Sequence, residues 1–293
     1  MIVDGLYRKN VCYIVAERLD NGVIEAVGTA FFVYCHAGPN ALVHYAVTAA
    51  HVIAQDPAYA GYFFRVNRRD GGFEDLPLLH EDWICHPTAD LAICHADFIP
   101  KFDTFSIPDW EICLSNADPG QDVFFIGLFV YAPGTRTVDA LVRFGKVCYP
   151  KTEVLNSNGE NYKAFLIEGT VIGGASGSPV FLHDEHYVKP EVNPLGIASL
   201  STIQRSRVMA SHVRPPLLGV IQGRFRDREW VMEAGIETDS SVDVGAGIAI
   251  VTPSEQIPEL LAHPRFVAER EAKEKEAERI VRAKGTPKPA GLQ

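Results

Sequence analysis

The sequence has no excess of basic residues and no long apolar run, and both absences exclude broad classes of function. It contains 27 lysines and arginines against 37 aspartates and glutamates, which gives a formal net charge of −10. A negative chain repels the phosphate backbone of nucleic acids, so we expect no nucleic-acid partner. No stretch approaches the roughly 20 consecutive apolar residues of a membrane-spanning helix, so we expect no membrane partner either.

The chain also lacks the apolar core of a secretory signal in its first ten residues, where Asp4 appears early. We therefore expect a cytoplasmic protein, in which the six cysteines are free thiols. No Cys-x-x-Cys pair occurs, and the Cys85-His86 and Cys94-His95 pairs match no standard zinc spacing. The sequence accordingly predicts no metal and no cofactor.

Short runs rich in valine, isoleucine, phenylalanine and tyrosine are present instead, bounded by glycine, proline, asparagine and aspartate. Examples are Val27–Tyr34, Val123–Phe129 and Gly247–Val251. This pattern is typical of an all-β protein, either a sandwich or a barrel. Two segments compete as the strand after Leu182, namely Leu195–Leu200 and Leu217–Gly223. We favour the second, because Pro215-Pro216 bounds it and leaves the preceding stretch as an inserted loop.

The most informative segment is Gly173–Phe181, with the sequence GGASGSPVF. Glycine permits positive φ angles and a close approach of backbones, so a turn of this kind exposes the hydroxyl of Ser176. The same turn directs backbone N–H groups toward whatever that hydroxyl attacks. Taken alone, a cluster of glycine and serine is more typical of an ordinary turn.

Two upstream segments supply partners for this hydroxyl. His51 lies in Ala46–Ile53, with the sequence AVTAAHVI, and Asp90 precedes the apolar residues Leu91–Ile93. Taken singly, His51 is typical of a core histidine and Asp90 of a turn residue. Taken together, in the order histidine, aspartate, serine, they predict a base, an orienting acid and a nucleophile.

These segments, with Gly28–Val33 and Gly245–Ile250, resemble the trypsin-like serine proteases, and most closely an HtrA-like bacterial branch without a PDZ domain. The resemblance extends from about Gly28 to about Leu261 and implies an all-β, chymotrypsin-like fold. We expect two six-stranded antiparallel β-barrels and a C-terminal helix. Residues 1–114 form the barrel with His51 and Asp90, and residues 115–262 form the barrel with Ser176 and end in a short helix. Residues 263–293 form a charged tail, helical or disordered.

The resemblance implies a serine endopeptidase that acts on a polypeptide substrate through an acyl-enzyme. Ser176 attacks, His51 is the base, and Asp90 fixes the imidazole. The oxyanion is bound by the backbone amides of Gly174 and Ser176. The pocket implied by the resemblance, suited to a small or medium apolar side chain, is lined by Thr170, Gln222, Gly223, Gly245 and Gly247.

Two other functions stay open. One is a catalytically idle module of the same fold that acts in binding or regulation, with a regulatory protein partner. The other is an esterase-like acyl hydrolase, which the fold resemblance disfavours because α/β-hydrolases carry their triad in the order serine, acid, histidine. Ala175 occupies the place where animal digestive members carry an aspartate that pairs with a new N-terminus. We therefore expect the nucleophile loop to be held by something else, either the insertion 183–214 or a partner.

Overall fold

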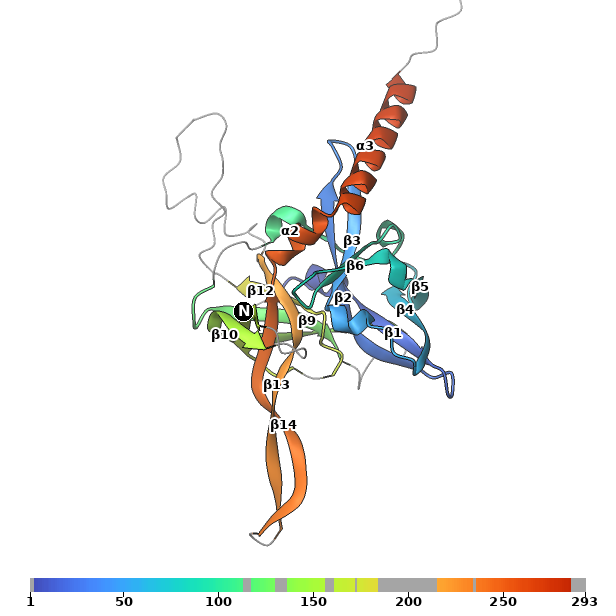
Figure 1. Cartoon of the computed structure of the whole chain (residues 1–293). Coiled ribbons are helices and arrows are strands. Elements are labelled where there is room, and N and C mark those ends of the chain that lie inside the picture. The colour runs from blue at the N-terminus through green and yellow to red at the C-terminus, as the bar shows by residue number, and fades with distance from the viewer. Residues whose placement is uncertain are drawn as a thin grey trace, which may run out of the picture.

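Strands dominate the computed structural model, which describes residues 3–112, 117–129, 136–155, 161–171, 173–183, 215–233 and 236–285. Two helices follow the last strand (Figure 1). Short 3₁₀ helices cover Gly5–Asn10, Ala50–Ile53, His80–Asp82, Ile99–Lys101 and Asp109–Glu111. In this part of the chain, no helix combines the length and the apolar character needed to cross a membrane.

The first half of the chain forms one sheet, in which the strand order is β5-β4-β1-β2-β3-β7-β6 and β8 pairs separately with β2. All of its pairings are antiparallel except that between β2 and β8. Its strands are β1 (Val11–Arg18), β2 (Ile24–His36), β3 (Leu42–Thr48), β4 (Tyr59–Asn67), β5 (Phe73–Leu78), β6 (Trp83–Cys85), β7 (Ala92–His95) and β8 (Ile107–Pro108).

This sheet differs from the expected six-stranded barrel. It has eight strands, and no pairing joins its end strands β5 and β6 within residues 3–112, which are described without a gap. The 3₁₀ turn His80–Asp82 redirects the chain, so that β6 pairs only with β7. Side chains close the interior where the backbones do not pair: the rings of Phe64 and Trp83 lie 5.8 Å apart between β4 and β6.

The second half forms a closed barrel of six strands in the order β10-β11-β14-β13-β12-β9, which confirms the expectation for this half. Its strands are β9 (Asp122–Leu128), β10 (Ala140–Leu155), β11 (Asn161–Glu168), β12 (Pro179–His183), β13 (Leu217–Glu233) and β14 (Ile236–Pro253). Strand β13 begins at Leu217, as predicted, and it pairs with β12. The competing segment 195–200 lies outside the described residues.

Strands β13 and β14 are much longer than the sequence suggested. Their pairing extends from Gly219 opposite Pro253 to Glu233 opposite Ile236. Figure 1 shows the distal part as a two-stranded ribbon that leaves the barrel. The ribbon continues the strand segment that lies beside the nucleophile loop.

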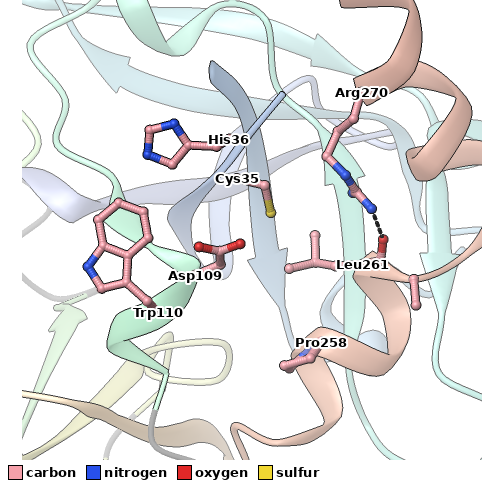
Figure 2. Close-up of a pocket in the computed structure, with 8 residues that line it drawn as sticks. Cys35, His36, Asp109, Trp110, Pro258, Leu261 and Arg270 are labelled. Carbon is pink, nitrogen blue, oxygen red and sulfur yellow. Dashed lines mark hydrogen bonds between the residues drawn. The ribbon is translucent and has the colours of Figure 1, made fainter. Parts of the chain in front are cut away.

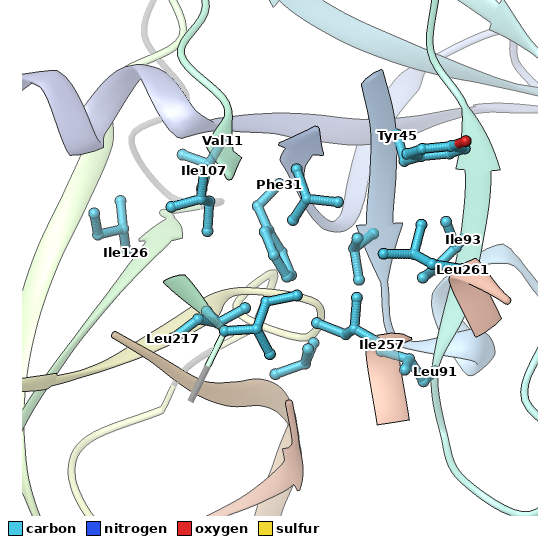
Figure 3. Close-up of a cluster of buried hydrophobic side chains, with 14 of the residues drawn as sticks. Val11, Phe31, Tyr45, Leu91, Ile93, Ile107, Ile126, Leu217, Ile257 and Leu261 are labelled. Atoms are coloured by element: carbon cyan, nitrogen blue, oxygen red, sulfur yellow. The ribbon is translucent and has the colours of Figure 1, made fainter. Parts of the chain in front are cut away.

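One hydrophobic cluster joins the two sheets and the helix α2 (Gln256–Leu261) (Figure 3). Phe31 from the first sheet and Leu217 from the barrel are fully buried in it, together with Ile257 from α2. Full burial of such a side chain contributes about 1.5–3 kcal/mol. The two halves and α2 are therefore held in a fixed relation by shared apolar contacts.

The helix α3 (Pro264–Gly285) begins with proline, which is favourable at a first helical position. Its first turns are packed rather than solvated: Phe266 is fully buried, with its ring 5.0 Å from that of Tyr45 on β3. Arg270 donates hydrogen bonds to the hydroxyl of Tyr45 and to the carbonyl oxygen of Leu261. The sequence left this segment helical or disordered and gave no sign of the docking, because one phenylalanine makes no apolar stripe.

Candidate functional site

His51 and Asp90 are joined by two hydrogen bonds. His51 lies in the 3₁₀ helix that follows β3, and Asp90 precedes β7, which pairs with β3. The Nδ1 atom of His51 is 2.6 Å from Oδ2 of Asp90, and the backbone N–H of His51 donates to Oδ1 over 2.9 Å. A carboxylate only accepts, so the neutral ring carries its proton on Nδ1. Nε2 is then left as an acceptor.

Ser176 lies in the loop between β11 and β12, and its hydroxyl donates to the carbonyl oxygen of Gln222 over 3.0 Å. Among the described residues, no hydrogen bond joins Ser176 to His51. The structure thus brings together two pairs from the predicted site, His51 with Asp90 and Ser176 with Gln222. It does not place a hydrogen bond between the pairs.

Thr29 on β2 holds the nucleophile loop from the first sheet. Its backbone N–H donates to the carbonyl oxygen of Ser176 over 2.8 Å, and its hydroxyl donates to that of Gly174 over 2.7 Å. The hydroxyl of Thr48 donates in turn to the carbonyl oxygen of Thr29. We expected this support from the insertion 183–214 or a partner, and residues 184–214 lie outside the described part. Sequence reasoning missed Thr29, because its strand motif gives no sign of a contact so distant along the chain.

The glycines of the loop are required by its geometry. Gly177 has a φ of +86°, and a Cβ there would lie 1.9 Å from the carbonyl oxygen of Thr29. Its N–H donates to the carbonyl oxygen of Ile221 over 2.7 Å. Gly174 has a φ of +85°, and neither its N–H nor that of Ser176 donates to a described residue. The two amides at the predicted oxyanion position thus have no backbone acceptor among the residues that the structure describes.

Ala175 fills space in the barrel core. It is 3% exposed and belongs to the same cluster as Phe125 and Val180. Its carbonyl oxygen accepts from the N–H of Ser178 over 3.0 Å, which closes the turn around the nucleophile. The position before Ser176 is thus an apolar anchor with no part in an ion pair.

Among the predicted pocket residues, Gln222 has a second contact, through its side chain. The hydroxyl of Tyr162 on β11 donates to Oε1 of Gln222. Burial raises the pKa of Tyr162 to about 12, so the phenol stays protonated and remains a donor. Sequence reasoning did not find Tyr162, because strand patterns do not show which residue reaches Gln222 from β11, on the far side of β14.

The other predicted pocket residues lie on the surrounding strands and turns. Gly223 pairs with Ile250, and Gly245 pairs with Arg226 in the ribbon. The carbonyl oxygen of Gly247 accepts from Gly169, and that of Thr170 accepts from the guanidinium of Arg143. None of these described contacts joins Thr170, Gly245 or Gly247 to Ser176.

A separate cavity of about 440 Å³ lies between the end of β2, residues 109–110 and the C-terminal helices (Figure 2). His36 and Trp110 stack in its wall, with ring centroids 5.3 Å apart. Burial raises the pKa of the Cys35 thiol to about 12, and a neutral thiol is a weak nucleophile. The cavity contains none of the predicted site residues.

The cysteines that the structure describes, Cys12, Cys35, Cys85, Cys94 and Cys148, are free thiols, whereas residue 113 lies outside the described ranges. Across those ranges, no three side chains of histidine, cysteine, aspartate or glutamate gather as a metal site.

Comparison with solved structures shows the fold. The protease domain of MamO from Magnetospirillum magneticum, in its apo form, is similar over 88% of this chain and 99% of its own, with a TM-score of 0.53 and 14% identity. The Rv3671c protease from M. tuberculosis, in its active form, is similar over 97% of this chain and 84% of its own, with a TM-score of 0.48 and 15% identity. No curated protein sequence matches the chain.

Comparison with protein families gives a match to the trypsin-like peptidase domain over residues 28–188. The match covers more than half of the chain, and it includes Thr29, His51, Asp90 and the nucleophile loop around Ser176. The chain therefore belongs to the trypsin-like peptidase family.

Proposed function

We propose that this protein is a serine endopeptidase, in which Ser176, His51 and Asp90 form the triad and a polypeptide is the substrate. The observation that carries the proposal is the double hydrogen bond of Asp90 to His51. It fixes the ring and the backbone of the histidine at once. It also leaves Nε2 unprotonated, as a general base requires.

The first chemical step forms a tetrahedral intermediate on Ser176. The hydroxyl proton of Ser176 moves to Nε2 of His51 while Oγ bonds to the substrate carbonyl carbon. The carbonyl π electrons move to oxygen, and the amides of Gly174 and Ser176, which have no backbone acceptor among the described residues, donate to that charge. Loss of one such donor typically costs about 3–4 kcal/mol of transition-state stabilisation. The Asp90 carboxylate stabilises the imidazolium.

The second half of the cycle releases both products. The oxyanion re-forms the carbonyl and the C–N bond breaks as the imidazolium of His51 gives its proton to the leaving amine, which leaves the acyl-enzyme on Ser176. Water then attacks the ester carbonyl, with His51 again taking a proton, and the acid product leaves Ser176 in its original state. Every proton taken up by Nε2 is thus returned within one cycle.

Before the first step, the hydroxyl of Ser176 must exchange its acceptor. It donates to the carbonyl oxygen of Gln222 in the structure, and it must turn toward Nε2 of His51 to react. This observation favours the second candidate, a catalytically idle module that binds or regulates. The two candidates differ in whether the hydroxyl leaves Gln222 when a substrate is present.

For the pocket, the contact between Ser176 and Gln222 supports a place beside the scissile bond for Gln222 and the adjacent Gly223. Thr170, Gly245 and Gly247 stay predicted pocket residues. We propose a preference for small or medium apolar side chains, which a peptide library dominated by cleavage after basic residues would contradict.

A fluorophosphonate probe separates the two candidates, because it reacts only with an activated serine. We expect the wild-type protein to be labelled and Ser176→Ala to be unlabelled. Ser178→Ala is the matched control, since this neighbouring hydroxyl is fully buried and should leave labelling intact. A folded wild-type protein that takes up no probe would favour the idle module.

A further inference from the structure

His86 is a buried histidine that the proposed mechanism does not use. It follows β6, four residues before Asp90, and its side chain is 6% exposed. A histidine buried this deeply needs a hydrogen-bond partner at each ring nitrogen. The structure provides partners at both.

The two ring nitrogens of His86 have different roles. Nδ1 is approached by the backbone N–H of Ala89 at 3.0 Å and by that of Thr88 at 3.3 Å, so it can only accept. The proton of the neutral ring is therefore on Nε2, which donates to Oε2 of Glu259 on α2 over 3.0 Å. A second proton, on Nδ1, would face two N–H donors and break this arrangement.

These contacts close the turn that presents Asp90. The N–H of His86 donates to the carbonyl oxygen of Leu91, and the N–H of Leu91 donates to that of Ala89, each over 2.8 Å. Ala89 and Leu91 are buried in the same apolar cluster as Ile257 of α2. The ring of His86 thus fixes the turn from inside and connects it to the C-terminal helix.

We propose that His86 is a positioning residue for Asp90. Its neutral ring clamps residues 86–89 and ties them to α2, so that the carboxylate of Asp90 stays in line with Nδ1 of His51. The effect on turnover rests on the proposed function, whereas the effect on the contact between Asp90 and His51 does not. The clamp at Nδ1 is the essential part, because the side chain of Glu259 is 64% exposed and contributes little.

Two substitutions of His86 test the contacts at Nδ1 and at Nε2 separately. In His86→Asn, the side-chain oxygen takes the place of Nδ1 and accepts from the same amides, as in an Asx turn. In His86→Gln, the side-chain NH₂ reaches the place of Nε2, but no acceptor is left for Ala89. Glu259→Ala removes only the link to α2. A role limited to filling volume would make Asn and Gln equally harmful.

The readouts are kcat, KM and the strongly deshielded NMR signal of the proton between His51 and Asp90. We expect H86Q to lower kcat about tenfold to hundredfold, with KM within about twofold, because the misplaced group acts in the chemical step. The deshielded signal should broaden or vanish in the same variant. H86N and E259A should stay within about threefold of the wild-type kcat and keep the signal.

Wild-type kcat and an unchanged signal in H86Q would overturn the proposal, as would equal losses in H86N and H86Q. If circular dichroism shows that H86Q does not fold, H86N still tests the proposal. Loss of the deshielded signal between His51 and Asp90 in H86N would contradict the clamp. If the wild-type protein takes up no fluorophosphonate, the proposed function fails. The NMR comparison still tests the position of Asp90.

Discussion

The backbone N–H of Thr29, in the first sheet, donates a 2.8 Å hydrogen bond to the carbonyl oxygen of Ser176, in the loop of the second barrel. The hydroxyl of the same threonine binds the carbonyl oxygen of Gly174. Two carbonyls of the nucleophile loop are thus fixed from the opposite sheet. With Ala175 before the nucleophile, this contact takes the place of an ion pair as the support of the loop.

Thr29→Val should loosen the nucleophile loop. Valine keeps the shape of threonine but leaves the carbonyl of Gly174 without its buried donor, which costs about 1–3 kcal/mol. We expect a lower free energy of unfolding and a kcat reduced about tenfold, a change that corresponds to 1.4 kcal/mol. Urea denaturation and peptide hydrolysis measure the two. Thr29→Ser keeps the hydroxyl and is the control, so equal losses in both variants would contradict this role.

Asp90→Asn should remove most of the turnover while leaving the fold intact. The asparagine amide no longer holds the proton of His51 on Nδ1, and the same change in a Ser-His-Asp triad lowers kcat about 10⁴-fold. Peptide hydrolysis and circular dichroism together test this. The exposed Asp118 provides the control D118N, which should behave as wild type. A loss of less than about tenfold in D90N would remove Asp90 from its proposed role.

Gly177→Ala should be far more damaging than Gly71→Ala, although both glycines have positive φ angles, +86° and +92°. A Cβ at 71 meets open space, so the only loss in the free energy of unfolding comes from the left-handed conformation and is about 1–2 kcal/mol. A Cβ at 177 also meets the carbonyl oxygen of Thr29, and this overpacking raises the total cost to about 2–5 kcal/mol. Denaturant unfolding of the two variants gives the comparison. Similar midpoints would show that the loop can move away from β2.

The cysteines should differ in reactivity according to burial. Cys12 and Cys94 are buried, and burial raises the pKa of each thiol well above its ordinary value. Cys85 and Cys148 are exposed, and their pKa is raised much less. Because the thiolate is the reactive form, iodoacetamide should modify Cys85 and Cys148 first in the folded protein. Mass spectrometry identifies the sites, and equally fast labelling of Cys12 would contradict the packing of β1.

Stability should decline in alkaline solution between pH 10 and about 12. Burial raises the pKa of Tyr45 and of Tyr162 from 10 to about 12 in the folded protein. Below pH 10, both phenols are neutral in the folded and unfolded states, and stability is complete. Above it, the unfolded chain releases protons that the folded chain keeps, which favours unfolding. Denaturant titrations across this range test the decline, which should be shallower in Tyr162→Phe than in the wild type.

The contact between His51 and Asp90 could be predicted from the sequence, because each residue lies in a short motif and the motifs occur in a diagnostic order. The two strands that bring them together, β3 and β7, pair directly, although β4, β5 and β6 lie between them in the chain. The start of β13 at Leu217 was predictable from Pro215-Pro216 and the local strand pattern. The closed barrel was implied by the family resemblance, because the strand pattern alone also allowed a sandwich.

The support of the site could not be predicted in the same way. Thr29 and Gly174 are 145 residues apart, and nothing local marks one as the partner of the other. The same holds for the hydroxyl of Tyr162 and the side chain of Gln222, which meet across the barrel surface. The bond from Ser176 to the carbonyl of Gln222 depends on the direction of a backbone group, which residue types do not encode. The length of the ribbon was missed because its charged residues interrupt the apolar pattern.

The close approach of Gly177 to Thr29 also limits how this protein can be recombined with its relatives. Gly177 lies against the carbonyl oxygen of Thr29 and the hydroxyl of Thr48, so the halves approach too closely at this point for a side chain at position 177. A chimera that takes one half from another trypsin-like peptidase must keep this close approach. The glycine at position 177 and the backbone around residue 29 must therefore come from the same parent protein, although they belong to different halves.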